Sequence, residues 1–564
     1  MLTVLAVGFV AGAVRTANDD PTPVVAPGPS DSDRPSDPGD PDPSASDTAP
    51  PVRAIGVHGG PFGETIGLTM FRGNPTRNWY GTGPMGSAYE IAWRYPDSPM
   101  CSQEVLSGGS VEGSSHSEVR PAAEPSQQPT DPPPTQPEPT EPQPTEPQPT
   151  EPPPTEPQPT EPGPSQTPSP SPRPPVVKLW CGSGWTGQPA IWVRPDGVTE
   201  LAVGTYDRRV HFLDVATGQP TRPAFPTGDI IKGSVTIDPD GFPLLYTGSR
   251  DNKYRAIALD RDTPTELFAL TPHPQGIWNN DWDGNGVIVD GILYEGGEDS
   301  WFRAVELNRT IDAEGRVQVA PEVLVEIPGF DNDLFSVLGD RNVSIETSPL
   351  VVGDRVYFAN SGGLIQGYDT SRVRDGEFPQ TLRFWAGDDI DATLVADEDG
   401  FIYAAVEYER KNERARTLGQ LLKLDPDNPD DPLVWGLPIP PRGEGGDGNG
   451  GLWATPALYG EYLYVTTHAG DLIVVDRRDG AIVWSERIGY HEWSSPVVVD
   501  DTLVVALCDK GGIRGYSLAD PSAPTQQWEV VVPSGACIES TPAVWEGRLY
   551  VGSRDGYLYS FAPS

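Results

Sequence analysis

The sequence is short of positive charge. It contains 39 Lys plus Arg against 81 Asp plus Glu, which gives a formal net charge of −42. Such an acidic chain is repelled by nucleic-acid phosphates and by anionic membrane surfaces, so both are excluded as partners, whereas cationic, neutral or metal-bridged partners are not. Only 36% of the 564 residues are hydrophobic, while 62 are Gly and 66 are Pro. Much of the chain therefore cannot be packed core, and part of it must be linker.

Catalytic motifs are also scarce. The six His are scattered and none has a Ser and an Asp at an informative spacing, so no catalytic triad is predicted. No Gly-rich loop precedes a predicted helix, which gives a phosphate cradle no support. The four Cys include no close pair, and a zinc site built from them would need close pairs. We therefore assign no catalytic residue and no metal ligand from the sequence.

One acidic stretch has the spacing of a calcium loop. In WNNDWDGNG, at 278–286, Asp281, Asp283 and Asn285 stand at positions one, three and five. An EF-hand loop also needs a carboxylate at position twelve, which is Ile292 here, and a helix on each side. The following VIVDGILYEGG consists of two apolar runs joined by Asp-Gly, which is typical of a tight hairpin. We predict a loop that leads into a hairpin, with calcium as the less favoured alternative.

Two tracts are too rich in Pro to form a core. Residues 17–52 are rich in Pro, Asp and Ser, and 101–181 contains PTEPQPTEPQPTEPPPTEPQ. Pro at nearly every second position prevents helix and sheet hydrogen bonding, which predicts a polyproline II spacer, with an SH3-like ligand as the alternative. The apolar start, 1–16, is expected to be an export signal or membrane anchor; it lacks a basic n-region, as in a signal whose start is truncated. A frayed apolar tail of a cytoplasmic protein is the alternative.

The remainder, 182–564, is repetitive. Eight stretches share one plan of an apolar run, a turn, an alternating run, a second turn and a third run. They begin near residues 187, 232, 283, 346, 391, 453, 494 and 539. Most are followed by a fourth apolar run, such as ELFAL at 266–270 and QQWEVVV at 526–532. Because one four-stranded sheet cannot bury both faces alone, the repeats predict an all-β fold, an eight-bladed β-propeller of antiparallel blades.

The last blade is expected to be completed by a strand from the start of the domain. The eighth unit reaches Ser564 without a fourth strand, while YEIAWRYP at 89–96 reads as a fourth strand with no unit before it. We predict that this strand, within an N-terminal segment at 53–100, closes the ring.

The repeats resemble a known family. VVDRRDGAIVWSERIG, STPAVWEGRLYVGSRDGYLYSF and the segment FRGNPTRNWYGTGP at 71–84 are similar to exported bacterial members of the PQQ-like, quinoprotein alcohol dehydrogenase-like propellers. The resemblance implies an eight-bladed ring in which Trp side chains dock each blade on the next. Residues at matching positions are Trp93, Trp385, Trp435, Trp484 and Trp528.

The family includes both quinone-dependent dehydrogenases and non-catalytic scaffolds. The enzymes typically have two adjacent Cys, a calcium-binding Glu and Asn pair and a catalytic Asp; here no Cys are neighbours, and no acid matches the catalytic Asp. The resemblance therefore favours a scaffold without cofactor, with PQQ and calcium as an alternative. Propeller geometry further implies two disulfides on one face of the ring, Cys101 with Cys181 and Cys508 with Cys537.

The segments that lead into each first strand should converge at the mouth of the central channel. They carry Trp185, Lys232, Asp281, Asp283, Glu346, Asp391, Trp453, Glu492, Trp493 and Glu539. We hypothesise a ligand site there, against the alternative that these residues only cap strands. The expected protein is a monomeric, extracytoplasmic scaffold, secreted or anchored through its N-terminal segment, that binds an unknown protein or cell-wall component; a glycan-binding propeller is a further alternative.

Overall fold

The computed structural model describes residues 59–106, 176–184, 187–441 and 450–564. The predicted export signal, the 17–52 linker and the Pro-rich tract between 107 and 175 lie outside these residues, as does Trp185. Within the described part, no helix is long and apolar enough to cross a membrane.

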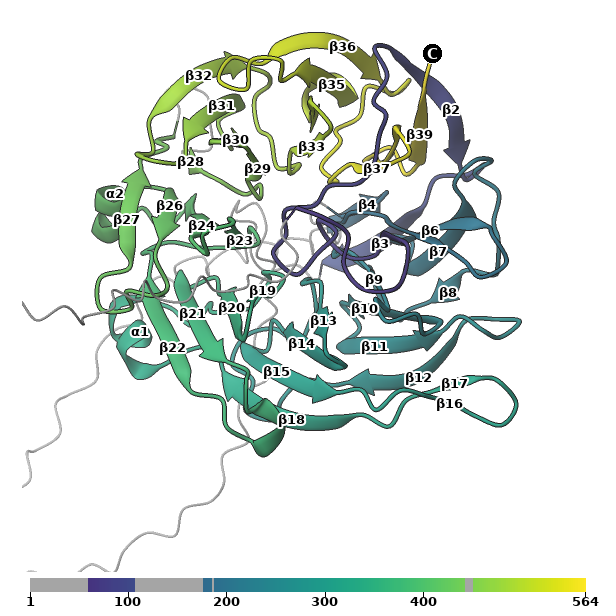
Figure 1. Cartoon of the computed structure of the whole chain (residues 1–564), viewed down its shortest axis with the longest axis horizontal. Coiled ribbons are helices and arrows are strands. Elements are labelled where there is room, and N and C mark those ends of the chain that lie inside the picture. The colour runs from purple at the N-terminus through teal and green to yellow at the C-terminus, as the bar shows by residue number, and fades with distance from the viewer. Residues whose placement is uncertain (1–58, 107–175, 185–186, 442–449) are drawn as a thin grey trace, which may run out of the picture. The chain divides into compact units, whose positions relative to one another are not determined.

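Eight antiparallel sheets are arranged around a central axis (Figure 1), which confirms the predicted eight-bladed propeller. In blades 1 to 4 the strands, from the inside of the ring outward, follow the chain order. Blade 1 has β5 (Ala190–Val193), β6 (Thr199–Thr205), β7 (Arg209–Asp214) and β8 (Phe225–Pro226); blade 2 has β9 (Thr236–Ile237), β10 (Leu244–Ser249), β11 (Lys253–Ala258) and β12 (Thr265–Leu270). Blade 3 has β13 (Val287–Val289), β14 (Ile292–Gly296), β15 (Trp301–Glu306) and β18 (Glu322–Pro328); blade 4 has β19 (Leu350–Val352), β20 (Arg355–Ala359), β21 (Leu364–Asp369) and β22 (Gln380–Trp385).

Blades 5 to 8 repeat the plan. Blade 5 has β23 (Val395–Ala396), β24 (Ile402–Ala405), β26 (Leu421–Leu424) and β27 (Leu433–Leu437); blade 6 has β29 (Ala457–Tyr459), β30 (Tyr462–Thr466), β31 (Asp471–Asp476) and β32 (Ile482–Arg487). Blade 7 has β33 (Val497–Val499), β34 (Thr502–Ala506), β35 (Gly512–Ser517) and β36 (Thr525–Val531); blade 8 has β37 (Ala543–Trp545), β38 (Arg548–Gly552), β39 (Leu558–Pro563) and β2 (Tyr89–Tyr95).

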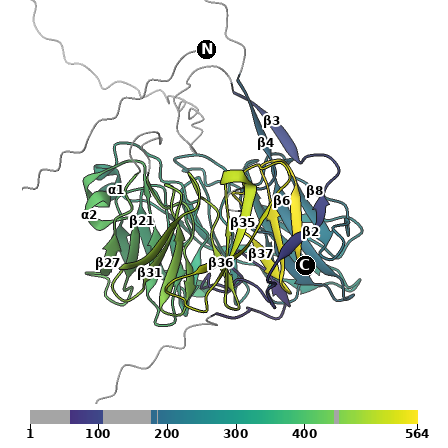
Figure 2. The same ribbon diagram turned by 90° about the horizontal axis from the view of Figure 1, so that it is seen from above.

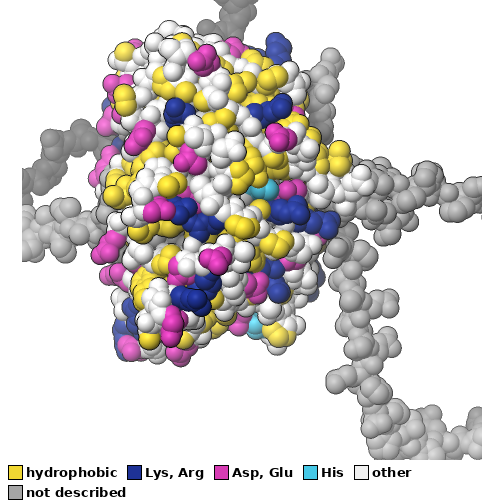
Figure 3. Space-filling view, turned by 90° about the vertical axis from the view of Figure 1, so that its right-hand side faces the viewer, with side chains coloured by type: hydrophobic (Ala, Val, Ile, Leu, Met, Phe, Trp, Pro, Cys, Tyr) yellow, Lys and Arg dark blue, Asp and Glu magenta, His cyan; other side chains and the backbone are white. Residues whose placement is uncertain are grey.

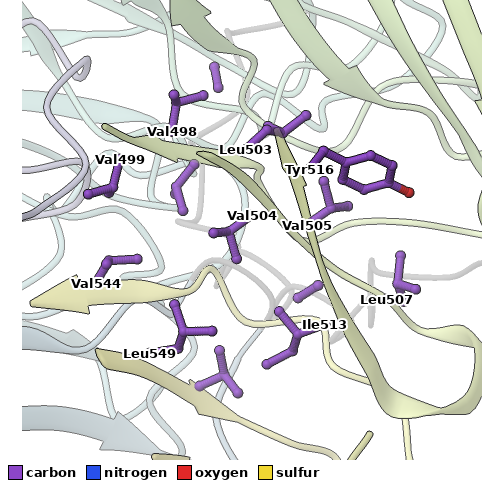
Figure 4. Packing of buried hydrophobic residues seen from close by; sticks show 14 of the residues in the cluster. Val498, Val499, Leu503, Val504, Val505, Leu507, Ile513, Tyr516, Val544 and Leu549 are labelled. Carbon is purple, nitrogen blue, oxygen red and sulfur yellow. The ribbon is translucent and has the colours of Figure 1, made fainter. Parts of the chain in front are cut away.

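The core lies between neighbouring blades. Figure 4 shows Val498, Leu503 and Val504 of blade 7 packed close to Val544 and Leu549 of blade 8. These side chains are 6% exposed or less, because each blade is apolar on both faces and meets a neighbour on each side. On the outer wall seen in Figure 3, acidic, basic and apolar side chains are interspersed.

The predicted ring closure is confirmed. β2 pairs antiparallel with β39, with Tyr89 opposite Pro563 and Tyr95 opposite Leu558. The indole Nε1 of Trp93 donates to the Val215 carbonyl of blade 1 at 3.0 Å, so the closing strand also ties blade 8 to blade 1. Trp435 makes the same kind of bond from blade 5 to the Arg477 carbonyl of blade 6.

The two faces of the ring differ. One face carries the loops before each first strand and between the second and third strands, and it contains both disulfides, Cys101–Cys181 and Cys508–Cys537, as predicted. We call it the disulfide face. A hairpin of β3 (Cys101–Leu106) and β4 (Val176–Cys181) rises from it (Figure 2). The ends of the predicted 101–181 insertion are therefore paired strands, which its composition had not indicated.

The remaining elements are short additions between strands. A hairpin of two strands interrupts blade 3, two further strands pair beside blade 5, and two one-turn-and-a-half helices lie in loops. They are β16 (Thr310–Ile311), β17 (Val317–Gln318), β25 (Glu407–Tyr408), β28 (Gly450–Gly451), α1 (Asn332–Val337) and α2 (Glu413–Leu418). Asn412 caps α2, accepting a hydrogen bond from the amide of Ala415.

Candidate functional site: the channel and its acidic mouth

The central channel is occupied by the chain's own N-terminal segment, residues 67–82, which we call the channel segment. It begins with β1 (Gly67–Leu68), which pairs with β5 of blade 1, and it ends where Gly81 forms a bridge with Val544 of blade 8. Between these points it bonds to the innermost strand, or to the loop that leads into it, in each of the other six blades. The contacted residues are Ile237, Asn285, Val351, Ala396, Leu458 and Pro496. The free inner edges of the blades thereby find partners, since unpaired backbone groups there would be costly.

Two arginines anchor the channel segment. Arg72 and Arg77 are fully buried, and both have positive φ, 55° and 62°. Arg72 donates to the carbonyls of Thr455, Pro456 and Pro496. Arg77 donates to the carbonyls of Phe71, Asn285 and Pro349, at 2.7 Å for Nη2 to Pro349. Burial lowers the pKa of Arg72 to about 10 and that of Arg77 to about 9, because removal from water disfavours the charged guanidinium groups.

Four of the predicted mouth residues come together above the channel segment on the disulfide face. Lys232 Nζ lies 2.5 Å from Asp283 Oδ2 and 3.9 Å from Glu346 Oε2. Arg250 completes the group, with its nitrogens 3.6 Å from Asp281 Oδ2 and 3.5 Å from Asp283 Oδ2. We call Lys232, Arg250, Asp281, Asp283, Glu298 and Glu346 the paired cluster, because both charge signs are present.

Burial sets the protonation of the paired cluster. It disfavours the charge on Asp283, but the nearby Lys232 and Arg250 outweigh burial and lower the pKa of that carboxyl. Asp281 is less well compensated, and burial raises its pKa to about 7. Burial, together with the neighbouring charges of Glu346 and Asp283, raises the pKa of Glu298 well above its usual range. The surroundings therefore favour the protonated form of Glu298 and the ionised form of Asp283.

A second group of acids lies beside blade 5. Asp391, a predicted mouth residue, lies with Asp389 and Glu407, and one carboxylate oxygen from each is within 4.8 Å of the other two. All three side chains are buried. Burial is the largest cause that raises the pKa of each well above its usual range. We call these three residues the acid triad.

The predicted aromatic residues of the mouth are buried. Trp453 is 1% exposed, and its ring centroid lies 3.9 Å from that of His468. Trp493 donates from Nε1 to His468 Nδ1 at 2.9 Å. Neither ring is available as an open stacking platform, so the mouth is a packed aromatic and acidic wall.

Glu492 and Glu539 lie next to the Cys508–Cys537 bridge, and Glu539 also interacts electrostatically with Lys232. Glu492 is fully buried and accepts a hydrogen bond from the amide of Cys508 at 2.8 Å; burial raises its pKa to about 8. Glu539 forms a 3.6 Å ion pair with Arg554. The nine described residues of the predicted ten therefore share one face but form several groups.

The acidic stretch at 278–286 does not converge on one point. Asp281 and Asp283 face Arg250 and Lys232, whereas the Asn285 side chain donates to Ser234 and Thr236 and accepts from the amide of Phe71. The residues after it form the predicted hairpin of β13 and β14. The calcium-loop spacing is therefore coincidental: the three side chains serve charge pairing and the channel segment.

Sequence reasoning missed Arg250, Glu298 and Glu407. Arg250 and Glu298 lie in the loops between second and third strands, in GSRD and GGED, and Arg554 stands in another GSRD. These loops share the disulfide face with the loops that lead into each blade, so a charged residue recurring there was the available signal. Glu407 lies in an expanded loop of blade 5 and had no such signal.

The residues of the acidic mouth do not fit a quinone cofactor. The cavity bounded by Phe71, Asp283, Glu346, Asp391 and Trp453 measures about 10 Å³, which is room for one water molecule. Organic cofactors occupy pockets of roughly 300 Å³ or more. Both described disulfides join distant residues, so no adjacent Cys pair covers the cavity. We therefore derive no reaction step through PQQ.

Comparison with known proteins identifies the repeats. A family described as "Outer membrane protein assembly factor BamB", of PQQ-like repeats, matches residues 419–564. No curated protein matches the chain. Similar solved structures include BamB from Moraxella catarrhalis, with 12% identity, TM-score 0.33, 67% of this chain and 82% of that chain covered. Quinohemoprotein alcohol dehydrogenase from Comamonas testosteroni has 11% identity and TM-score 0.45, with 68% of this chain and 76% of that chain covered. A computationally designed protein, Ika8, has 10% identity and TM-score 0.44, with 66% and 95% covered.

The matched residues span blades 6 to 8 and the end of blade 5, and the remaining blades continue the same strand plan around the ring. Residues 419–564 therefore match the PQQ-like repeat family, and the other blades share their strand plan.

Proposed function

We propose that the protein is a non-catalytic, extracytoplasmic scaffold that binds another protein through its disulfide face. The observation that carries the proposal is the filled channel: residues 67–82 bond to all eight blades and leave a cavity of about 10 Å³ beneath the acidic mouth. A propeller whose axis is closed in this way is left with its two faces for recognition, and beside Tyr80 and Leu458 one of them has a hollow of about 450 Å³.

The disulfide face has the features of a contact surface. The β3–β4 hairpin rises from it and exposes 56% of Leu179, and Tyr490 is 58% exposed in the loop before β33. Both are held in place by bridges: Cys101–Cys181 ties the base of the hairpin, and Tyr490 Oη lies 3.8 Å from Cys508 Sγ. Fixed aromatic and aliphatic side chains lose little entropy when they bind, which suits them as anchors of a protein interface.

The disulfides also support an extracytoplasmic location. Two bridges use all four Cys of the chain, and such bridges persist in oxidising compartments. The apolar start of the sequence agrees with export. A net charge of −42 favours a partner with a basic or neutral surface over an acidic one.

Site-specific photo-crosslinking in the producing organism tests the proposal. p-Benzoylphenylalanine is incorporated at Tyr490, at Leu179, or at the control position Ile311, which is 52% exposed on the β16–β17 hairpin away from the disulfide face. We expect discrete, protease-sensitive adducts from Tyr490 and Leu179 and none from Ile311. Absence of adducts at both test positions, equal adducts from all three, or adducts that only glycan-degrading enzymes remove would overturn the proposal.

A further inference from the structure

The acid triad brings three buried carboxylates together in blade 5. Asp389 and Asp391 precede β23, and Glu407 opens β25, so the three carboxylates come from two segments of blade 5. They are 9%, 6% and 2% exposed, respectively. None forms an ion pair with a Lys, Arg or His of the described residues, whereas Asp283 in the paired cluster has Lys232 at 2.5 Å.

Two oxygens of the triad have no hydrogen-bond partner at all. Asp389 Oδ1 and Glu407 Oε1 are buried and unpartnered, and both residues contribute to the group of oxygens that lies within 4.8 Å. A buried carboxylate oxygen without a donor costs about 1–3 kcal/mol or more. Two such oxygens, on side chains of one close group of acids that repel each other, indicate a positive ligand within the group.

We propose that Asp389, Asp391 and Glu407 form a divalent-cation site that takes calcium. Calcium–oxygen distances of about 2.3–2.6 Å place two ligands of one ion up to about 5 Å apart, so three oxygens within 4.8 Å can contact a single ion. The triad offers only carboxylate oxygens, which are hard ligands that suit calcium over zinc or copper. Water completes the coordination, because calcium takes six to eight oxygens.

The neighbouring groups are mostly acidic, which favours a cation further. Burial, then the charges of Asp391 and Asp389, raises the pKa of Glu407, and Glu346 acts on Asp391 in the same direction. Arg410 is the nearest compensating charge, but its guanidinium donates to Asp340 and to the Asn342 and Ser361 carbonyls instead of the triad. The ion therefore supplies the positive charge that Arg410, which bonds to other groups, does not bring to the triad.

The site ties two parts of blade 5 together. The Glu407 amide donates to the Asp389 carbonyl at 2.9 Å, and β25 pairs with β28 across Glu407 and Gly451. A cation between the two side chains would fasten the loop before β23 to this small sheet at the edge of the channel mouth. Calcium thus acts as a structural ligand of the disulfide face, and this role stands whether or not that face binds a protein.

The test is calorimetric and thermal titration of the chelator-treated full chain with CaCl₂ in 150 mM NaCl, with MgCl₂ in parallel. We expect one calcium per chain with Kd of about 0.1–1 mM, as in extracellular modules. Calcium a hundredfold above Kd should raise Tm by about 3 °C. Glu407→Gln and Asp391→Asn should each lose the calcium-dependent shift. Because they remove repulsion, both should fold with Tm at or above that of the calcium-free parent.

Glu298→Gln is the matched control, since Glu298 belongs to another close group of three acids, with Asp283 and Glu346, in which Lys232 pairs with Asp283. It should keep the full calcium response. The inference is overturned if the parent shows no calcium-dependent shift, if Glu407→Gln and Asp391→Asn respond like the parent, or if only Glu298→Gln loses the response.

Discussion

Replacing Arg77 by Ala is the sharpest test of the closed channel. The guanidinium makes five hydrogen bonds of 2.7–3.3 Å, to the carbonyls of Phe71, Asn285 and Pro349 and to the Asn285 side chain. Its loss leaves three buried carbonyls without a donor, at about 1–3 kcal/mol each. Relief from burying the guanidinium offsets part of this, so we expect a net loss of about 3–5 kcal/mol, as for removal of one member of a buried charged pair.

Thermal and urea unfolding of the full chain measure this loss. For a ring of this size the expected fall in Tm is about 3–6 °C. The Tm of Arg77→Lys should lie between those of the parent and of Arg77→Ala, because an ammonium keeps the charge but reaches fewer carbonyls. Arg372→Ala is the control: Arg372 pairs with Asp375 and Glu377 on the surface and should change stability by about 0.5 kcal/mol or less. Equal effects of Arg77→Ala and Arg372→Ala would refute the role given to the channel segment.

Three further predictions concern pH, ring closure and the bridged hairpin. Burial raises the pKa of Glu492 to about 8, so protonated Glu492 stabilises the fold fully below about pH 4.5, and this stabilisation is lost as pH rises through 8. Glu492→Gln should therefore flatten the fall in Tm between pH 5 and 9, and an unchanged slope would contradict the raised pKa of Glu492. Trp93→Ala should cost about 2–4 kcal/mol in urea unfolding, because its indole bonds to Val215, whereas Ile91→Ala on the same strand should cost far less. Removing Cys101–Cys181, which closes a loop with a separation of 80 residues, should cost about 4 kcal/mol in the chain-entropy model, and an unaltered Tm would argue against it.

The ring was predictable because its signals are local and repeated. Alternating apolar runs and turns are visible in the sequence of each blade. The strand at 89–95 was assigned to blade 8 because the eighth unit had no fourth strand of its own. The pairing of all four Cys followed from which loops share a face. Blade 1 is the exception: its outer strand β8 has two residues and carries no recognisable run.

The channel segment was not predictable from its pattern. Its groups bond to eight different blades, so no periodicity marks it, and no local pattern indicates that Arg72 and Arg77 are buried. The site residues likewise divide into those that a repeated sequence signal marks and those that it does not. Lys232, Asp283 and Asp391 were found because the loop before each first strand recurs, whereas Glu407 belongs to an insertion found in one blade only. Burial of Trp453 and Trp493 depends on contacts between blades, which the sequence does not encode locally.

Equilibrium dialysis of the full chain against pyrroloquinoline quinone with CaCl₂ tests the central claim, that the chain fills its own channel and leaves its surface for binding. The cavity of about 10 Å³ predicts retention of quinone no greater than that of an unrelated acidic protein. Saturable retention of one quinone per chain, with reduction of an electron-accepting dye on addition of alcohols or aldoses, would contradict the closed channel and restore the enzyme.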